Sequence, residues 1–287
     1  MIFEKEYAIT RVRAMKGKLL KKETLDSIKS AKTKESLVNS LHKTIYGREF
    51  ADVKDITKEH TALETDLNNA ILKIRKFIPG IFKNDMNYIL EKKDMQNLKI
   101  ILRNFYAEKN TDKESLFKKG KIYSCFCGGG ITNLETLGNE LKHTPYYAPY
   151  MTGYIQYKET GNLQDIEKEL EKQNTKISHA SEELRKFLQM NLELDDFCVL
   201  VRLEKKGLSK ENTNLHFKNR SSEIMKKYNS LLKDDAPLEQ KKEEYITTKL
   251  KETTTNDPFS FLVVIDYLTK KEREIRTLQT CLKEVVA

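Results

Sequence analysis

The fold of this chain is decided by one stretch, Asp94-Met95-Gln96-Asn97-Leu98-Lys99-Ile100-Ile101-Leu102-Arg103. Its large apolar side chains recur at the spacing of one buried stripe on an amphipathic helix, at Leu98, Ile101, Leu102 and Phe105. The acid and the amide at its start suit a helix N-terminus, where backbone N–H groups need acceptors and negative charge is favourable. The pattern predicts a helix over Met86–Tyr106 that packs through this stripe.

The same pattern returns roughly a hundred residues later, in Glu193–Arg202, and again ends in an arginine. Two further pairs of segments match in the same order at a similar separation: Leu41–Tyr46 with Leu141–Tyr146, and Leu63–Leu67 with Ile166–Leu170. Helical periodicity alone does not produce the shared Leu-x-x-Thr-x-Tyr. A weaker third copy of the motif, without its arginine, stands at Lys271–Leu278. These matches indicate related helical units.

We therefore predict an all-α fold of three similar helical units, at residues 1–115, 116–210 and 211–287. The 11 glycines and 5 prolines are few, and such a composition with abundant Lys, Glu and Leu favours helices over a many-turned β fold. Cys125–Thr132 is expected to be a loop. The main expected helices are Tyr7–Leu20, Lys34–Tyr46, Ile56–Phe77, Met86–Tyr106, Leu163–Asn174, Ser178–Leu192, Tyr245–Lys251 and Phe259–Val285.

Composition narrows the class of protein. The net charge is +9 and 33% of the residues are charged, so an acidic surface, lipid headgroups or nucleic acid can attract the chain. Because most of these charges interleave in sign, a solvated helix face is the favoured interpretation. Four cysteines without regular spacing favour a reducing compartment.

No secretory signal and no membrane span are expected. Met1–Glu6 becomes charged almost at once, unlike a signal peptide. The most apolar run, Phe259–Leu268, is interrupted by Asp266 and is far shorter than the roughly 20 residues that span a bilayer. Any membrane contact is therefore expected to be peripheral.

No group of residues predicts a catalytic, cofactor-binding or metal site. Gly128–Gly130 lacks the Lys-Ser/Thr that completes a phosphate loop. Cys125 and Cys127 have no second pair at zinc spacing, and their role stays open. The histidines stand in no metalloprotease or triad context; they are His42, His60, His143, His179 and His216.

Two groups of polar residues are candidates for binding a partner. The helix over Tyr7–Leu20 carries a group of four basic residues that could bind phosphates or an acidic surface. The simpler interpretation is that they form the solvated outer side of an amphipathic helix. This group is Arg11, Arg13, Lys16 and Lys18. The motif copies carry Asn97, Lys99, Arg103 and Arg202. Because the arginine recurs, these residues are at least as well suited to tying neighbouring helix ends together.

Four segments, in this order, resemble the C subunit of the archaeal-type (A-type) and V-type ATP synthases, a relative of the d subunit of the eukaryotic V-ATPase. They are Tyr7–Leu20, Asp94–Arg103, Leu194–Gly207, and Pro258–Ser260 with Tyr267–Ile275. The resemblance covers nearly the whole chain. The chain is somewhat short for the family, with a compressed third unit, and it stops soon after Leu282, where members often continue.

The resemblance implies an all-helical funnel of three similar units around a pseudo-threefold axis, with no enzymatic activity. It implies a peripheral protein at the cytoplasmic face of the membrane, between the central stalk and the proteolipid rotor ring. There it would pass torque between ATP turnover and the transport of protons or sodium ions. The alternatives are a free-standing helical adaptor and a basic nucleic-acid-binding protein. Neither is favoured, because solenoid repeats are shorter, at about 20–50 residues, and no nucleic-acid motif accompanies the basic helix.

Overall fold

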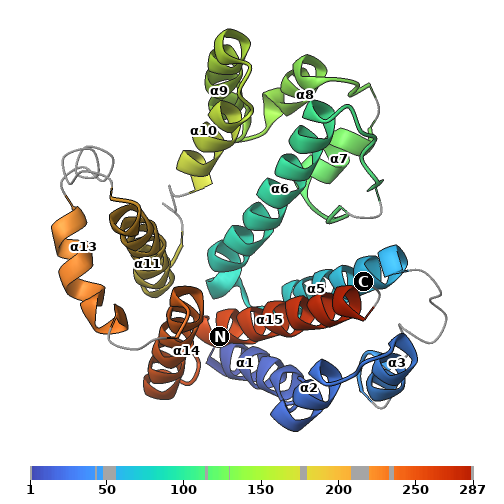
Figure 1. Cartoon of the computed structure of the whole chain (residues 1–287), viewed down its shortest axis with the longest axis vertical. Coiled ribbons are helices and arrows are strands. Elements are labelled where there is room, and N and C mark those ends of the chain that lie inside the picture. Colours follow the sequence, from blue (N-terminus) through green and yellow to red (C-terminus); the bar gives the residue numbers. More distant parts are fainter. Residues whose placement is uncertain are drawn as a thin grey trace. The chain divides into compact units, whose positions relative to one another are not determined.

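The computed structural model describes residues 2–42, 44–47, 56–113, 116–128, 130–174, 180–207, 220–232 and 236–285 (Figure 1). Over these ranges the regular structure is helical and contains no strand. The all-α prediction is therefore confirmed for this part of the chain. Gly129, the expected helix start at Ser178, His179 and His216 lie outside the described residues.

The chain divides into two compact units. The first consists of Met1–Ala180 together with Leu268–Ala287, and the second of Ser181–Tyr267. The first unit thus combines segments from both ends of the sequence, and the second is inserted between them. The division into three units ending at residues 115, 210 and 287 remains a prediction.

Over the described residues, both units consist of helices. Those of the first unit are α1 (Ile2–Lys16), α2 (Lys22–Lys29), α3 (Lys34–His42), α5 (Ile56–Phe77), η1 (Gly80–Phe82), α6 (Lys83–Tyr106), α7 (Lys121–Cys127), α8 (Leu134–Glu140), η3 (Leu141–His143), α9 (Tyr147–Thr160) and α10 (Gln164–Asn174). Those of the second unit are α11 (Glu182–Lys205), α13 (Ser221–Tyr228), η4 (Asn229–Leu232) and α14 (Leu238–Asn256). The division falls within α15 (Leu262–Glu284), which belongs to the first unit from Leu268 onward.

Helix α6 carries the first motif but begins well before it. Its first residue is Lys83, directly after the short η1 turn. Asp94 therefore lies in the middle of the helix, where it is 3% exposed. The interpretation of Asp94 as part of a helix start is wrong. The N–H groups around it are used by the helix itself, so its carboxylate is available to another element.

The loop expected at Cys125–Thr132 begins as helix. Cys125 and Cys127 lie in the last turn of α7, which ends at Gly128. Gly120 precedes α7 and provides no side-chain cap, so no local signal marks the helix start. A Cβ on Gly120 would lie 1.9 Å from Asp94 Oδ1. Glycine is therefore required for the close approach of α6 to this helix start.

One core of the first unit lies around α6 and the α9–α10 pair. At Gly153 of α9 an added Cβ would lie 2.5 Å from the Cα of Ile166 in α10, so glycine allows the two helices to touch. The ring of Tyr150 stacks on that of Tyr154 at 5.9 Å, and its hydroxyl donates to the Leu134 carbonyl at 2.6 Å. The apolar stripe of α6 is buried in this same core, as predicted, through Leu98, Ile101 and Leu102.

In the second unit, α11 buries the second motif against α13. Phe197 packs its ring against Tyr228 with centroids 5.8 Å apart. The rest of this core comes mainly from the same two helices, with Leu194, Leu200, Val201 and Ile224.

The repeated Leu-x-x-Thr-x-Tyr segments adopt the same local turn. In the first, the Thr44 hydroxyl donates to the Leu41 carbonyl at 2.6 Å and accepts the Tyr46 N–H at 3.2 Å. In the second, Thr144 makes the equivalent bonds at 2.8 and 3.3 Å. One threonine oxygen thus bridges the same two backbone groups in both copies, so the sequence match extends to backbone geometry.

Candidate functional site

In the first motif, two polar side chains of α6 hold the segment that leads into α7. The Asp94 carboxylate accepts the N–H groups of Lys121 and Ile122, each at 3.1 Å. The Asn97 amide donates to the Phe117 carbonyl at 3.0 Å and accepts the Phe117 N–H at 2.8 Å. Burial raises the pKa of Asp94, although both backbone hydrogen bonds act to lower it. Asn97 is 2% exposed and ties two segments together, in line with the structural interpretation of the motif.

Lys99 and Arg103 reach from the same helix to α10. Lys99 Nζ lies 2.5 Å from a carboxylate oxygen of Glu171. Arg103 donates from Nε and Nη2 to both carboxylate oxygens of Glu167, at 2.6 and 3.0 Å. This two-pronged arrangement is the stronger geometry for an arginine and a carboxylate. Both side chains thus join α6 to α10, while that of Arg103 remains 62% exposed.

In the second motif, Glu193 stands at the position of Asp94 but binds side chains instead of backbone. Its carboxylate pairs with Lys227 at 2.6 Å and Arg220 at 3.3 Å, and it accepts the Tyr228 hydroxyl at 3.1 Å. Burial acts to raise the pKa of Glu193, but its hydrogen bonds outweigh burial and leave that pKa below its usual value. Burial also raises the pKa of Tyr228 to about 12.

Arg202 ends the second motif as Arg103 ends the first. It pairs with Glu239 in the first turn of α14. Lys242, on the same helix, pairs with Asp195 of the motif. Arg103 and Arg202 therefore have equivalent roles, because each joins its motif helix to a later helix of the same unit.

The weak third copy forms part of a buried ionic network. Lys271 is 2% exposed, pairs with Asp66, and donates to the Tyr46 hydroxyl at 2.8 Å. That hydroxyl donates to Glu274, which also accepts the Leu20 N–H at 2.5 Å. Burial raises the pKa of Glu274. These partners cannot be predicted from the sequence, because no local pattern connects Tyr46 with a lysine 225 positions away.

Helix α1 carries the predicted basic group. The Arg11 guanidinium lies over the ring of Phe77 at 4.3 Å and over that of Tyr7 at 5.5 Å, so it joins α1 to the end of α5. Arg13 is exposed along with Lys18, which follows the helix, and Lys16 is half-buried. This arrangement matches the expected basic outer side.

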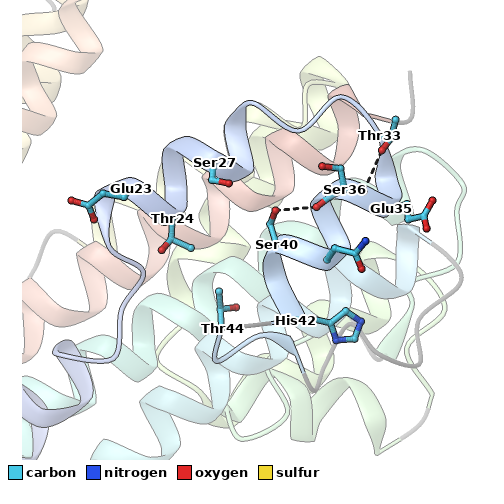
Figure 2. Close-up of a pocket in the computed structure, with 10 residues that line it drawn as sticks. Glu23, Thr24, Ser27, Thr33, Glu35, Ser36, Ser40, His42 and Thr44 are labelled. Atoms are coloured by element: carbon cyan, nitrogen blue, oxygen red, sulfur yellow. Dashed lines mark hydrogen bonds between the residues drawn. The ribbon is translucent and has the colours of Figure 1, made fainter.

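A broad polar groove lies along α2 and α3, and Figure 2 shows its lining. Hydroxyl and amide side chains predominate, together with Glu23, Glu35 and His42. The drawn hydrogen bonds run from the Ser36 N–H to Thr33 and from the Ser40 hydroxyl to the Ser36 carbonyl, so they serve α3 itself. Among these lining residues no hydrogen bond joins His42 to a serine.

A second pocket, with a volume of about 540 Å³, lies among α5, α6 and α15 in the first unit. Asn97, Lys99 and Arg103 line it, together with Lys92 and Lys93. The structure therefore brings three of the predicted partner residues to one place. The other predicted residues lie elsewhere, at α1 and in the second unit.

Metal and membrane features can be assessed for the described ranges alone. There, no group of three or more His, Cys, Asp or Glu side chains is placed to hold a metal ion. Cys125 and Cys127 are half-buried thiols, and burial raises the pKa of Cys125, which disfavours its reactive thiolate. No helix in these ranges combines the length and apolar character needed to cross a membrane.

Comparison with known proteins identifies the family. Residues 8–221 match the model of the ATP synthase (C/AC39) subunit family, which is more than half of the chain, so the chain belongs to that family. The family predicted from the sequence motifs is thereby confirmed.

Several curated relatives are named as the C subunit of an A-type ATP synthase. The chain is 25% identical to the one from Methanosarcina acetivorans, over 72% of this chain but only 60% of that protein's length. It is 22% identical to those from a Desulfurococcus species and from Thermococcus onnurineus, over 96% of this chain and 85% of each relative.

Proposed function

We propose that this chain is a non-catalytic central-stalk component of a V-type or A-type rotary ATPase or ATP synthase. In this role it links the central stalk to the membrane proteolipid ring and transmits the torque that couples ATP turnover to proton or sodium transport. The observation that carries the proposal is membership of the ATP synthase (C/AC39) subunit family. The relatives named as the C subunit of A-type ATP synthases support it.

The internal ties of the motif helices suit a part that transmits torque. In each copy, polar side chains bind the motif helix to another segment. Asp94 and Asn97 do so in the first copy and Glu193 in the second. Lys271 and Glu274 do so in the third. Such ties resist slipping under load better than apolar contact alone, because hydrogen bonds are directional. The proposal includes a funnel of three similar units around a pseudo-threefold axis, with the stalk seated in its cavity.

The proposed location is the cytoplasmic face of the membrane, with peripheral contact only. The basic side of α1, with Arg11, Arg13, Lys16 and Lys18, would face an acidic neighbour or lipid headgroups. Lys99, Arg103 and Arg202 would use the sides that their ion pairs leave exposed. Asn97 would contribute only indirectly, by holding in place the helix that carries Lys99 and Arg103, because both ends of its amide are hydrogen-bonded within the chain.

Affinity purification from membranes, followed by identification of the proteins that co-purify, tests the assignment to this complex. The rotor role is tested by cross-linking in a chain carrying Cys125→Ser and Cys127→Ser, which removes the half-buried thiols. A new cysteine in place of the exposed Lys18 is then linked either to the ring or to a stationary part of the complex.

A rotor part turns with the ring. We therefore expect the ring-linked complex to keep ATP-driven ion transport, and the complex linked to a stationary part to lose it. The unlinked cysteine variant is the control for both. Loss of transport on linking to the ring, with transport kept in the unlinked control, would show that this chain is not a rotor part.

A further inference from the structure

The pocket among α5, α6 and α15 contains cations that the chain does not neutralise by ion pairing. Lys99 and Arg103 are already paired with acids of α10. Lys92, Lys93 and Arg276 also line the pocket, and the side chains of these three residues form no hydrogen bond or ion pair with any described residue. These three side chains come from two helices that are far apart in the sequence and meet at this pocket.

Lys93 is the most informative of these residues. It is 7% exposed, so more than nine-tenths of it is buried, and it lines the pocket. Burial lowers its pKa, while the charges of Glu272 and Glu64 act to raise that pKa without forming ion pairs. No hydrogen bond or ion pair to a described residue involves its ammonium group, which is therefore available to a ligand in the pocket. The comparably buried Lys271 of the same unit, by contrast, is satisfied by a carboxylate and a hydroxyl.

The same pocket contains hydrogen-bond acceptors. Asn68 Oδ1 is buried and has no hydrogen-bond partner among the described residues. The carboxylates of Glu64 and Glu272 also line the pocket. A ligand that satisfies all of these groups presents negatively charged oxygens to the cations and an O–H group to the acceptors.

We propose that this pocket binds phosphate, either as the free ion or as a group carried on an ester. In this site Lys93 is the central cation, Lys92 and Arg276 bind the remaining oxygens, and Asn68 Oδ1 accepts the phosphate O–H. Near neutral pH the free ion supplies both the charge and a P–O–H donor that sulfate lacks, whereas an ester has mostly lost that proton and would offer Asn68 Oδ1 a hydroxyl of the group that carries it. A volume of about 540 Å³ accommodates the ion with water around it. This site is independent of the proposed rotary function.

The first test measures phosphate binding by the full chain. Isothermal titration near pH 7 compares sodium phosphate with sodium sulfate at matched ionic strength. We expect phosphate to bind and sulfate to bind at least about tenfold more weakly, because sulfate leaves the acceptors unsatisfied. Lys93→Met should weaken phosphate binding at least about tenfold. The matched control is Lys22→Met, an exposed lysine of α2 outside the pocket, which should bind like the parent.

A second variant keeps the test independent of changes in folding. Arg276→Gln retains Lys93 but removes a cation from the pocket, and it should also weaken phosphate binding. Thermal unfolding with and without phosphate gives a ligand-dependent shift within each variant, so that any difference in basal stability cancels.

Two further ligands distinguish the source of the phosphate. Glycerol 3-phosphate and vesicles containing phosphatidate are compared with inorganic phosphate. Lys93-dependent binding of inorganic phosphate alone assigns the site to the free ion, and Lys93-dependent binding of the ester or the vesicles assigns it to a phosphate ester. Equal responses to phosphate and sulfate, or phosphate binding that survives both Lys93→Met and Arg276→Gln, would show an adventitious ion only and overturn the proposal.

Discussion

The two clear motif copies occupy equivalent positions on α6 and α11, yet their leading acids act by different chemistry. Asp94 is buried and accepts backbone N–H groups at the start of α7, a contact that Gly120 makes possible. Glu193 is partly exposed and binds the cations and the hydroxyl of a neighbouring segment. The carboxylate position is therefore shared, but its partners are a helix end in one unit and side chains in the other.

This difference has an energetic consequence. Burial dominates at Asp94 and raises its pKa, whereas hydrogen bonds outweigh burial at Glu193 and lower its pKa. The contact made by Asp94 depends on close geometry, because one carboxylate must accept two backbone N–H groups. The contact made by Glu193 depends on charge, and its cations are partly exposed to salt. The same motif position therefore holds its helix by hydrogen bonds to backbone in one unit and by ion pairs in the other.

The largest expected effect tests the apolar part that both copies share. Leu102→Ala should destabilise the first unit by about 2–5 kcal/mol, because it removes a fully buried leucine from a packed core. Val201→Ala should destabilise the second unit by less, since fewer buried atoms are lost. Urea unfolding followed with a probe in each unit measures both. If both variants unfold like the parent, the two stripes are not equivalent core positions.

The next effect separates the two acids. Asp94→Ala leaves the N–H groups of Lys121 and Ile122 without their acceptor, at a cost of about 1–3 kcal/mol. Glu193→Ala should cost less, because the two cations that it pairs with, Arg220 and Lys227, are about half exposed and water can replace the carboxylate there. The comparison fails if Glu193→Ala is the more destabilising variant in the same urea titration.

The pH dependence of stability should have opposite sign at the two acids. The folded pKa of Asp94 is raised, so its contribution falls as pH rises from its unfolded value, about 3.9, through the folded value. The folded pKa of Glu193 is lowered, so its contribution is present above about 4.3 and is lost as pH falls through the folded value. Unfolding free energies from pH 3 to 7 for Asp94→Asn and Glu193→Gln, each subtracted from the parent, should slope in opposite directions. Parallel slopes would contradict this interpretation.

The smallest effect concerns the arginines that end each copy. Arg103→Gln and Arg202→Gln should each cost less than about 1 kcal/mol, because both arginine side chains are largely exposed. The cost should be larger for Arg103, whose guanidinium meets both oxygens of Glu167. Thermal unfolding at low and high salt measures both, and the difference should shrink at high salt. A cost at Arg103 that does not change with salt would point to packing as its main contribution.

Local patterns predicted the helical class, the buried stripe and the repeat, but they gave no helix over α9 (Tyr147–Thr160) and only a short part of α14 (Leu238–Asn256). The stripe through Leu98, Ile101 and Leu102 is buried, because helical spacing alone determines which side chains share a face. The match between the segments around Thr44 and Thr144 reflects one local turn that a short peptide can encode.

The same local patterns could not predict which distant segments contact one another. Asp94 has the chemistry of a helix cap, but the helix it caps begins on another segment, which no spacing rule reveals. Lys93 and Lys271 lie on helices with many other lysines, and their burial depends on which helices meet. The role of Lys271 in particular depends on Asp66 and Tyr46, which are distant in the sequence.

The joining of the two chain ends in the first unit has a consequence for synthesis on the ribosome. Tyr46 and Asp66 emerge early, whereas Lys271 and Glu274 emerge only after the whole second unit has been made. The nascent N-terminal segment therefore carries this half of a buried polar network without its partners during translation. The second unit is contiguous and can fold as it emerges, whereas the first can be completed only when α15 arrives. Ribosome-bound chains ending before Leu268 should accordingly expose the α5 region to protease.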